Sequence, residues 1–159
     1  MGGQTSTAGE TVLSNTVMRT VIAGFIAGAV GVLVFHQVGF LIATQLKLST
    51  AIFYNMKPLP PWGVPTVVSQ AFWGGLWGIA AAFIVPRLPN PLKGALGWTL
   101  FGGVVVMLAN WFIVLPIKGA PIGGGWRMPA TVVVPVVYAF WGFGMWVIYN
   151  LVRRTMKWA

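Results

Sequence analysis

The chain has 159 residues, of which 57% are hydrophobic and 7% charged, and its formal net charge is +9. The absence of cysteine excludes disulfides, thiolate metal sites and thiol nucleophiles. The length allows one domain, and because the basic residues stand singly or in pairs at the ends of apolar runs, we expect membrane headgroups and not nucleic acid as their partners.

The chain opens with a short polar segment. Residues 1–16 are mostly small and polar, and they contain Glu10, the only acidic residue. This composition predicts a flexible polar tail over residues 1–16, followed by one transmembrane domain over residues 17–159. Met1 and Met18 both remain open as the start of translation.

Four long apolar runs follow the tail. Each holds roughly 20 residues with almost no charge, which at about 1.5 Å of rise per residue matches a hydrocarbon core of roughly 30 Å. The predicted fold class is therefore all-α, an integral membrane bundle of four transmembrane helices. The predicted spans are residues 17–43, 65–85, 95–117 and 129–152.

Two internal similarities in the sequence suggest that the spans form two repeated helical hairpins. Ala71-Phe72-Trp73-Gly74 in the second span recurs as Ala139-Phe140-Trp141-Gly142 in the fourth. In the first and third spans, one interval separates the members of two pairs: Arg19 with His36, and Lys93 with Asn110. A parallel repeat of roughly 70 residues and a chance similarity between helices of restricted composition remain alternatives.

Glycines recur at helical spacing in the first two spans. One stripe consists of Gly24, Gly28 and Gly31, and the other of Gly74 and Gly78. Since water cannot drive association inside lipid, such small residues promote helix packing by letting backbones approach closely. The stripes predict either packing within one chain, which is the simpler interpretation, or the seam of a homodimer.

Polar side chains within the spans gather in the half that lies away from the chain ends. They should point inward, because an unsatisfied polar group in hydrocarbon costs several kcal/mol. We therefore expect a polar pocket roofed by the two loops rich in Pro and Gly, with hydrogen bonding between helices as the simpler alternative. The candidate pocket residues are His36, Gln37, Ser69, Gln70, Asn110, Thr131 and Tyr138.

His36 is the only histidine of the chain. Without Cys or a carboxylate inside the spans, it cannot build a metal or haem site alone, so we predict no cofactor, no metal and no catalytic residue. The missing carboxylate also argues against a carrier coupled to protons or cations.

The basic residues predict the orientation. Six lie on the side of the termini and four on the other side, which favours cytoplasmic termini under the positive-inside rule. Tryptophans near the span ends are expected to act as interfacial anchors. They are Trp62, Trp98, Trp126 and Trp158.

Several segments of the spans and loops form a distinctive set of motifs. They are Arg19–Phe25, Phe35–Gln37, Phe53–Met56 with Pro58, Pro60 and Pro61, Gly63–Pro65, Ala71–Gly78 and Gly124–Trp126. Together they resemble a family of small, uncharacterised four-span proteins of the bacterial inner membrane, over about Met18 to Leu151. The resemblance implies an inner-membrane location and supplies no activity.

Two function classes follow from these observations. The first is a non-enzymatic membrane component that associates with itself or supports another membrane protein. The second is a channel or facilitator for a small neutral or anionic solute, which needs an oligomer because one bundle of four helices scarcely encloses a pore. A redox or quinone-binding subunit would lack a second ligand for its cofactor.

Overall fold

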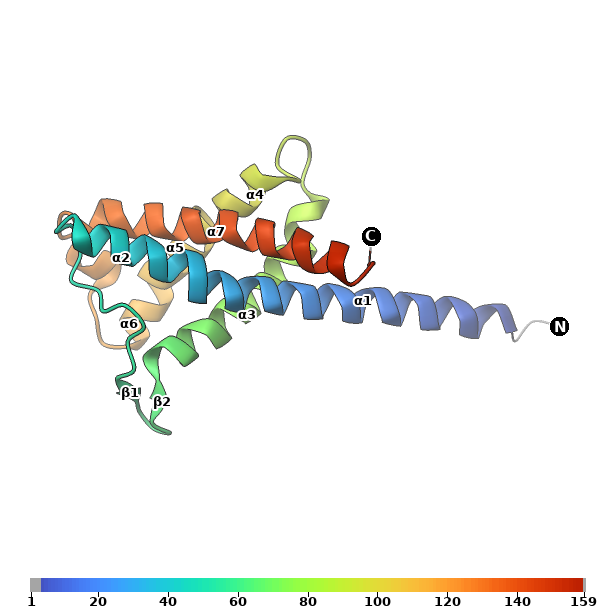
Figure 1. Ribbon diagram of the computed structural model, residues 1–159, viewed down its shortest axis with the longest axis horizontal. Helices are drawn as coiled ribbons and strands as arrows, with labels where there is room; N and C mark the ends of the chain where they lie inside the picture. Colours follow the sequence, from blue (N-terminus) through green and yellow to red (C-terminus); the bar gives the residue numbers. More distant parts are fainter. Residues whose placement is uncertain (1–3, 159) are drawn as a thin grey trace.

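The computed structural model describes residues 4–158, and four long helical crossings packed together confirm the predicted all-α bundle (Figure 1). The first crossing consists of α1 (Gln4–Gly31), the π-helical η1 (Val32–His36) and α2 (Gln37–Gln45). The second consists of α3 (Thr66–Ile84) and the 3-10 turn η2 (Val85–Arg87). The third consists of α4 (Ala95–Leu100), η3 (Phe101–Val106), α5 (Met107–Ala109), η4 (Asn110–Val114) and α6 (Leu115–Ile117). The fourth is α7 (Ala130–Thr155).

The four crossings are long and apolar enough to traverse a bilayer, so the chain is a multi-pass membrane protein. The third crossing has the bounds that the sequence predicted, and the second and fourth differ from the prediction by a few residues at their ends. The membrane-spanning stretches are Thr11–Gln45, Thr66–Arg87, Ala95–Ile117 and Ala130–Thr155.

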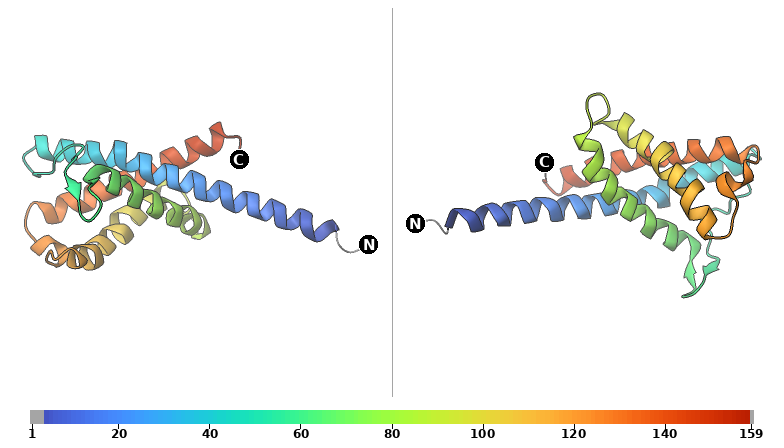
Figure 2. Two further views of the ribbon diagram at one scale, coloured as in Figure 1. Left: turned by 90° about the horizontal axis from the view of Figure 1, so that it is seen from below. Right: turned by 180° about the vertical axis from the view of Figure 1, so that it is seen from behind.

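The N-terminal segment, for which the sequence predicted a flexible polar tail, is helical from Gln4 onward. Helix α1 already begins at Gln4, and it extends well past the C-terminal end of α7 (Figures 1 and 2). Once the packed part of a helix exists, each further residue adds a backbone hydrogen bond at little cost. The hydroxyls of Thr16 and Thr20 also donate to the carbonyls of Val12 and Thr16, at 3.0 and 2.9 Å.

The bundle has two distinct ends. We call the end with the C-terminus and residues 88–94 the terminal end, and the end with residues 46–65 and 118–129 the loop end. At the loop end, β1 (Pro58–Leu59) pairs antiparallel with β2 (Val64–Pro65), and the short helix η5 (Ile122–Gly125) precedes α7. Trp62, at the tip of the small ladder, is 86% exposed.

Glycines bring α1 and α3 into backbone contact. A Cβ atom at Gly28 would lie 1.9 Å from the carbonyl oxygen of Gly74, and one at Gly78 would lie 2.2 Å from that of Gly24. No larger residue fits at this crossing without separating the helices. These two stripes therefore pack against each other within the chain, as the simpler of the two interpretations predicted.

The third and fourth crossings meet in the same way. A Cβ atom at Gly102 would lie 2.9 Å from the Cα atom of Gly142. Gly28 precedes Gly102 by the same number of residues as Arg19 precedes Lys93. Gly74 and Gly142 are the glycines of the two Ala-Phe-Trp-Gly motifs. The contact of the first hairpin thus recurs at equivalent positions of the second, in agreement with a parallel repeat.

The two hairpins join where α1 and α7 run alongside each other (Figures 1 and 2). Gly31, the third member of the stripe on the first span, faces α7, since its Cβ would lie 3.1 Å from the indole nitrogen of Trp141. On α7, a Cβ at Gly144 would lie 2.3 Å from the ring of Phe35. Small residues on both helices therefore close this seam.

The equivalent seam between α3 and the third crossing is open. The positions that correspond to Gly31 and Gly144 carry Val105 and Leu76, whose side chains are 48% and 38% exposed. Helix α3 meets the third crossing near the terminal end, where the rings of Trp77 and Phe101 lie 6.2 Å apart. Toward the loop end, α3 and the third crossing separate. We attribute this separation to Val105 and Leu76, which are bulkier than glycine and prevent the close approach that glycines permit.

The buried core lies in the terminal half of the bundle. Trp98 is 2% exposed, and its ring lies 5.0 Å from that of Tyr149, beside the fully buried Met145 and Val85. The expectation that Trp98 anchors the protein at the membrane surface is therefore wrong. The Trp98 ring faces α7. Helix α7 approaches closely here, since a Cβ at Gly142 would lie 2.4 Å from the Trp98 carbonyl oxygen.

Candidate functional site: a polar cavity at the loop end

A cavity of about 440 Å³ lies between the crossings toward the loop end. All four crossings and the β1 strand contribute to its wall. Its mouth carries Leu59, Thr66 and Lys118. Its polar lining residues are His36, Thr66, Ser69, Gln70, Asn110, Lys118 and Tyr138.

Tryptophans form the deep part of the cavity. Along α3 the lining runs from Thr66 to Trp77, a depth of about 16 Å by helical rise. Trp73 and Trp141 join Trp77 there, and the buried core that contains Trp98 follows toward the terminal end. The cavity therefore combines polar walls with an aromatic floor.

The structure brings together five of the seven predicted pocket residues. These are His36, Ser69, Gln70, Asn110 and Tyr138. Gln37 does not line the cavity, and its side chain instead hydrogen-bonds to Gln70 and to the backbone N–H of Tyr54. Thr131 does not line it either.

Thr131 lies beyond the mouth of the cavity. It precedes Tyr138 by two helical turns, which is about 10 Å along the axis of α7. Its hydroxyl donates to the carbonyl of Arg127 at 3.1 Å, one turn back along the chain. The prediction that Thr131 belongs to the pocket is therefore wrong, although it shares a helical face with Tyr138.

Gln37 supports the cavity wall from behind. Its side-chain nitrogen donates to the side-chain oxygen of Gln70 at 3.2 Å, and its own oxygen accepts from the backbone N–H of Tyr54 at 3.0 Å. Gln37 is 4% exposed, so both hydrogen bonds are shielded from solvent. This chain of contacts fixes the orientation of Gln70 and ties the 46–65 loop to the first crossing.

The π-helical turn η1 shapes the same region. In a regular α-helix the N–H of Gln37 would donate to the carbonyl of Leu33, but here it donates to Val32 and Val34. The hydroxyl of Tyr54 donates to the Leu33 carbonyl instead. The irregular turn is thereby stabilised by the loop that covers the cavity.

His36 is the most unusual group in the wall. It is 7% exposed, and its Nδ1 atom has no hydrogen-bond partner among the described residues. Its ring packs edge-on against Phe40 and Tyr138, with centroid distances of 4.9 and 5.6 Å. A buried polar atom without a partner costs free energy, so His36 differs from a fully hydrogen-bonded core residue.

The chemistry of the wall is hydrogen bonding. An imidazole, two amides and a phenol offer both donors and acceptors, and Lys118 adds a positive charge at the mouth. Among the described residues, no three His, Cys, Asp or Glu side chains come together in a way that would hold a metal ion. The wall thus suits a small polar molecule.

Equivalent positions of the two hairpins line the cavity in pairs. Two pairs of lining residues have the same separation in the sequence as Arg19 and Lys93. Two further pairs have the same separation as the two copies of the Ala-Phe-Trp-Gly motif. The pairs are Val32 with Val106, His36 with Asn110, Gln70 with Tyr138, and Trp73 with Trp141. The cavity therefore lies at the interface of the two hairpins.

The sequence did not identify the tryptophans or Lys118 as lining residues. The repeated Ala-Phe-Trp-Gly motif marked Trp73 and Trp141 as signs of a repeat, and Trp73 was otherwise considered only with His36 for a redox or quinone-binding role. No family model, curated protein or solved structure matches the chain. The resemblance to a bacterial family therefore depends on its motifs alone.

Proposed function

We propose that the protein is a non-enzymatic facilitator that admits a small neutral or anionic solute through the cavity at the loop end. The observation that carries this proposal is the pairing of equivalent positions around one cavity. In membrane transporters built from repeats, the substrate site lies at the interface of the repeats.

The lining supports the proposed class of solute. The sequence has no Asp and a single Glu, Glu10, and the described residues that line the cavity include no carboxylate side chain to bind a cation. Lys118 at the mouth attracts anions, while His36 and Asn110 can bind neutral polar groups. A volume of about 440 Å³ accommodates a small molecule.

A non-enzymatic role is supported by the surroundings of His36. Nucleophilic catalysis needs a nucleophile beside a base that a third group orients. Ser69 and His36 both line the cavity, but His36 has aromatic neighbours and no carboxylate to orient it.

Passage of the solute through the protein requires the tryptophan floor to open, within one chain or in an oligomer.

The sequence alone favoured a self-associating or accessory component over a facilitator. Its support was the glycine stripes, the lack of catalytic groups and the small size, and Gly24, Gly28, Gly74 and Gly78 are occupied by contacts inside the chain. The facilitator is therefore the better supported of the two functions. An accessory role stays a prediction.

We further propose that the protein lies in the bacterial inner membrane with both termini in the cytoplasm. The terminal end carries Arg19, Arg87, Lys93, Arg153, Arg154 and Lys157, and the loop end carries Lys47, Lys57, Lys118 and Arg127. A reporter active only outside the cytoplasm should function after Gly119 and fail at the C-terminus. The reverse pattern would contradict this orientation.

Permeation into proteoliposomes tests the facilitator. Glycerol and urea serve as neutral probes and formate as an anionic probe, with uptake followed by light scattering after an osmotic step. We expect Ser69→Trp, which fills the cavity, to abolish the uptake of any permeant probe. Val68→Trp is the matched control, because Val68 is 50% exposed and lies outside the cavity. Equal uptake by both variants, or no uptake above that of empty liposomes, would refute the function.

A further inference from the structure

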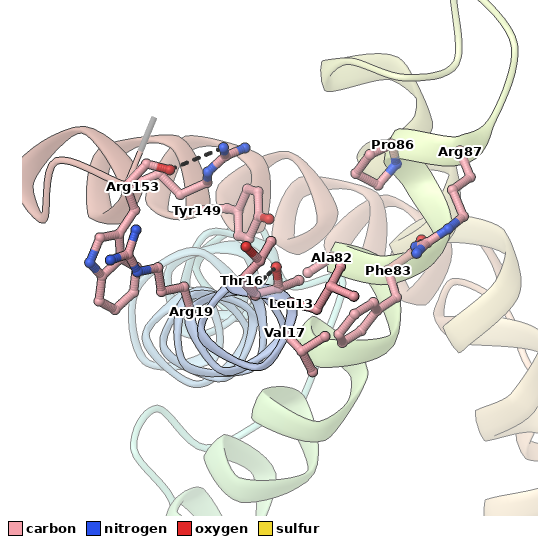
Figure 3. A pocket seen from close by; sticks show the side chains of 12 residues that line it. Leu13, Thr16, Val17, Arg19, Ala82, Phe83, Pro86, Arg87, Tyr149 and Arg153 are labelled. Carbon is pink, nitrogen blue, oxygen red and sulfur yellow. Dashed lines mark hydrogen bonds between the residues drawn. The ribbon is translucent and has the colours of Figure 1, made fainter. Parts of the chain in front are cut away.

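A second cavity lies at the terminal end of the bundle, remote from the first. Its volume is about 680 Å³, and α1, η2 and α7 all contribute to its wall (Figure 3). Three of its lining residues are arginines, one from each of these elements: Arg19, Arg87 and Arg153. The sequence had treated these residues only as separate basic groups at the ends of spans.

Each guanidinium group is held beside the cavity by an aromatic ring. Arg19 and Arg153 lie 5.9 and 5.7 Å from the ring centroids of Trp158 and Tyr149. Arg153 also donates to the backbone carbonyl of Trp158 at 3.2 Å. In Figure 3 these two arginines lie on one side of the cavity and Arg87 on the other.

Arg87 is anchored within its own helical turn. Its guanidinium group lies 5.7 Å from the ring centroid of Phe83 and donates to the Phe83 carbonyl. A guanidinium group has five N–H donors, so all three arginines keep donors for a ligand. Positive charges collected in this way repel one another unless an anion lies between them.

The described residues that line this cavity include no carboxylate side chain to neutralise these charges. The sequence has one acidic residue, Glu10, against ten Lys and Arg residues. Guanidinium groups bind phosphate with paired, charge-assisted hydrogen bonds. The chemistry of the cavity therefore fits a phosphate group supplied from outside the chain.

The position of the cavity favours a lipid as the source of that phosphate. Arg87 ends the second membrane-spanning stretch, and Arg153 lies in the last turn of α7. Apolar side chains of Leu13, Val17 and Phe83 line the same cavity. Basic pockets between transmembrane helices at the bilayer surface bind the headgroups of anionic lipids.

We propose that this cavity is a binding site for the phosphate-bearing headgroup of an anionic phospholipid. The arginines bind the phosphate oxygens, and the apolar residues contact the glycerol and upper acyl region. Because the arginines lie on opposite sides, the cavity also suits a headgroup with two phosphates. The site goes beyond the proposed solute pathway and does not depend on it.

Native mass spectrometry of the full-length protein in detergent measures this binding. The probes are phosphatidylglycerol, cardiolipin and phosphatidylcholine, and inorganic phosphate is tested separately by thermal unfolding. We expect both anionic lipids to bind at least about tenfold more tightly than phosphatidylcholine. Thermal unfolding is also measured with phosphatidylglycerol. If millimolar inorganic phosphate raises the thermal midpoint as much as phosphatidylglycerol does, the site binds a free anion and the lipid proposal is overturned.

Arginine variants locate the site. We expect Arg87→Gln and Arg153→Gln each to weaken phosphatidylglycerol binding by about tenfold. Arg154→Gln should leave binding unchanged, because Arg154 is exposed on the same helix and does not line the cavity. An equal loss in Arg154→Gln, or no loss in Arg87→Gln, would overturn the proposal. If Arg153→Gln misfolds, Arg87→Gln alone tests the proposal, since Arg87 contacts the ring and carbonyl of Phe83 within its own helical turn.

Discussion

The indole of Trp141 is 2% exposed, whereas that of Trp73, at the equivalent position of the first hairpin, is 59% exposed. Trp141 fits against Gly31 of α1, and its indole N–H donates to the carbonyl of Gly28 at 3.2 Å. Trp73 borders the open seam, where Val105 replaces the glycine. Both tryptophans line the cavity, but only Trp141 is also a buried contact between the two hairpins.

This asymmetry predicts unequal effects of the same substitution. Trp141→Phe removes a buried hydrogen bond and part of a packed ring, and should lower the free energy of unfolding by about 1 to 2 kcal/mol. Trp73→Phe should change it by less than about 0.5 kcal/mol, since the ring is largely exposed. Denaturant unfolding in micelles measures both, and equal losses would contradict the buried role of Trp141.

The glycine crossing predicts a steric effect. Gly28→Ala places a methyl group 1.9 Å from the Gly74 carbonyl oxygen, so α1 and α3 must separate. Overpacking of this kind costs about 1 to 3 kcal/mol, and we expect a clearly lower thermal midpoint. Gly9→Ala is the control, because a Cβ there meets nothing within 4 Å. A Gly28→Ala protein as stable as the control would show that the helices do not meet there.

The cavity predicts selective labelling. The native chain contains no cysteine, so an introduced thiol is the only target. Asn110→Cys, in the cavity wall, should react with a membrane-impermeant thiol reagent applied from the side of the loop end. Ala81→Cys, at a position 0% exposed, should stay unlabelled. Complete protection of the Asn110→Cys protein would refute an open cavity.

The hydrogen bonds of Gln37 predict the order of the covering loop. Gln37→Leu removes the acceptor for the backbone N–H of Tyr54, so hydrogen exchange at that amide should accelerate by about tenfold, equivalent to about 1.4 kcal/mol. Gln45→Leu replaces an exposed amide of α2 and should leave exchange at Tyr54 unchanged. Unchanged exchange in Gln37→Leu would mean that the loop is held by other contacts.

The spans were predictable because lipid imposes a simple requirement. A crossing needs a long apolar run with its backbone amides paired inside the helix, and the run at 95–117 shows this requirement clearly enough to give its bounds. The start of α1 at Gln4 was not predictable. Polar composition suggested an irregular tail, but a helix extends readily from a packed segment.

The candidate site was predictable only in part, for a geometric reason. Helical spacing placed Gln70 and Asn110 in the same half of the bundle, and the structure brings both to one cavity. Spacing cannot tell which helices separate, because that depends on contacts such as Gly144 against Phe35. The tryptophan floor and the arginine cavity follow from these separations, so the sequence pattern did not reveal them.

The joints of this bundle have a consequence for its connectivity. Each hairpin is fastened by its own glycine crossing, and the glycines of α1 and α7 fasten one hairpin to the other. None of these contacts involves the stretch 88–94, whose close contact is with the start of α4, where the Leu92 carbonyl lies against Gly97. A break in that stretch would leave the glycine contacts between the crossings in place, so we expect the two hairpins to associate when they are produced as separate chains.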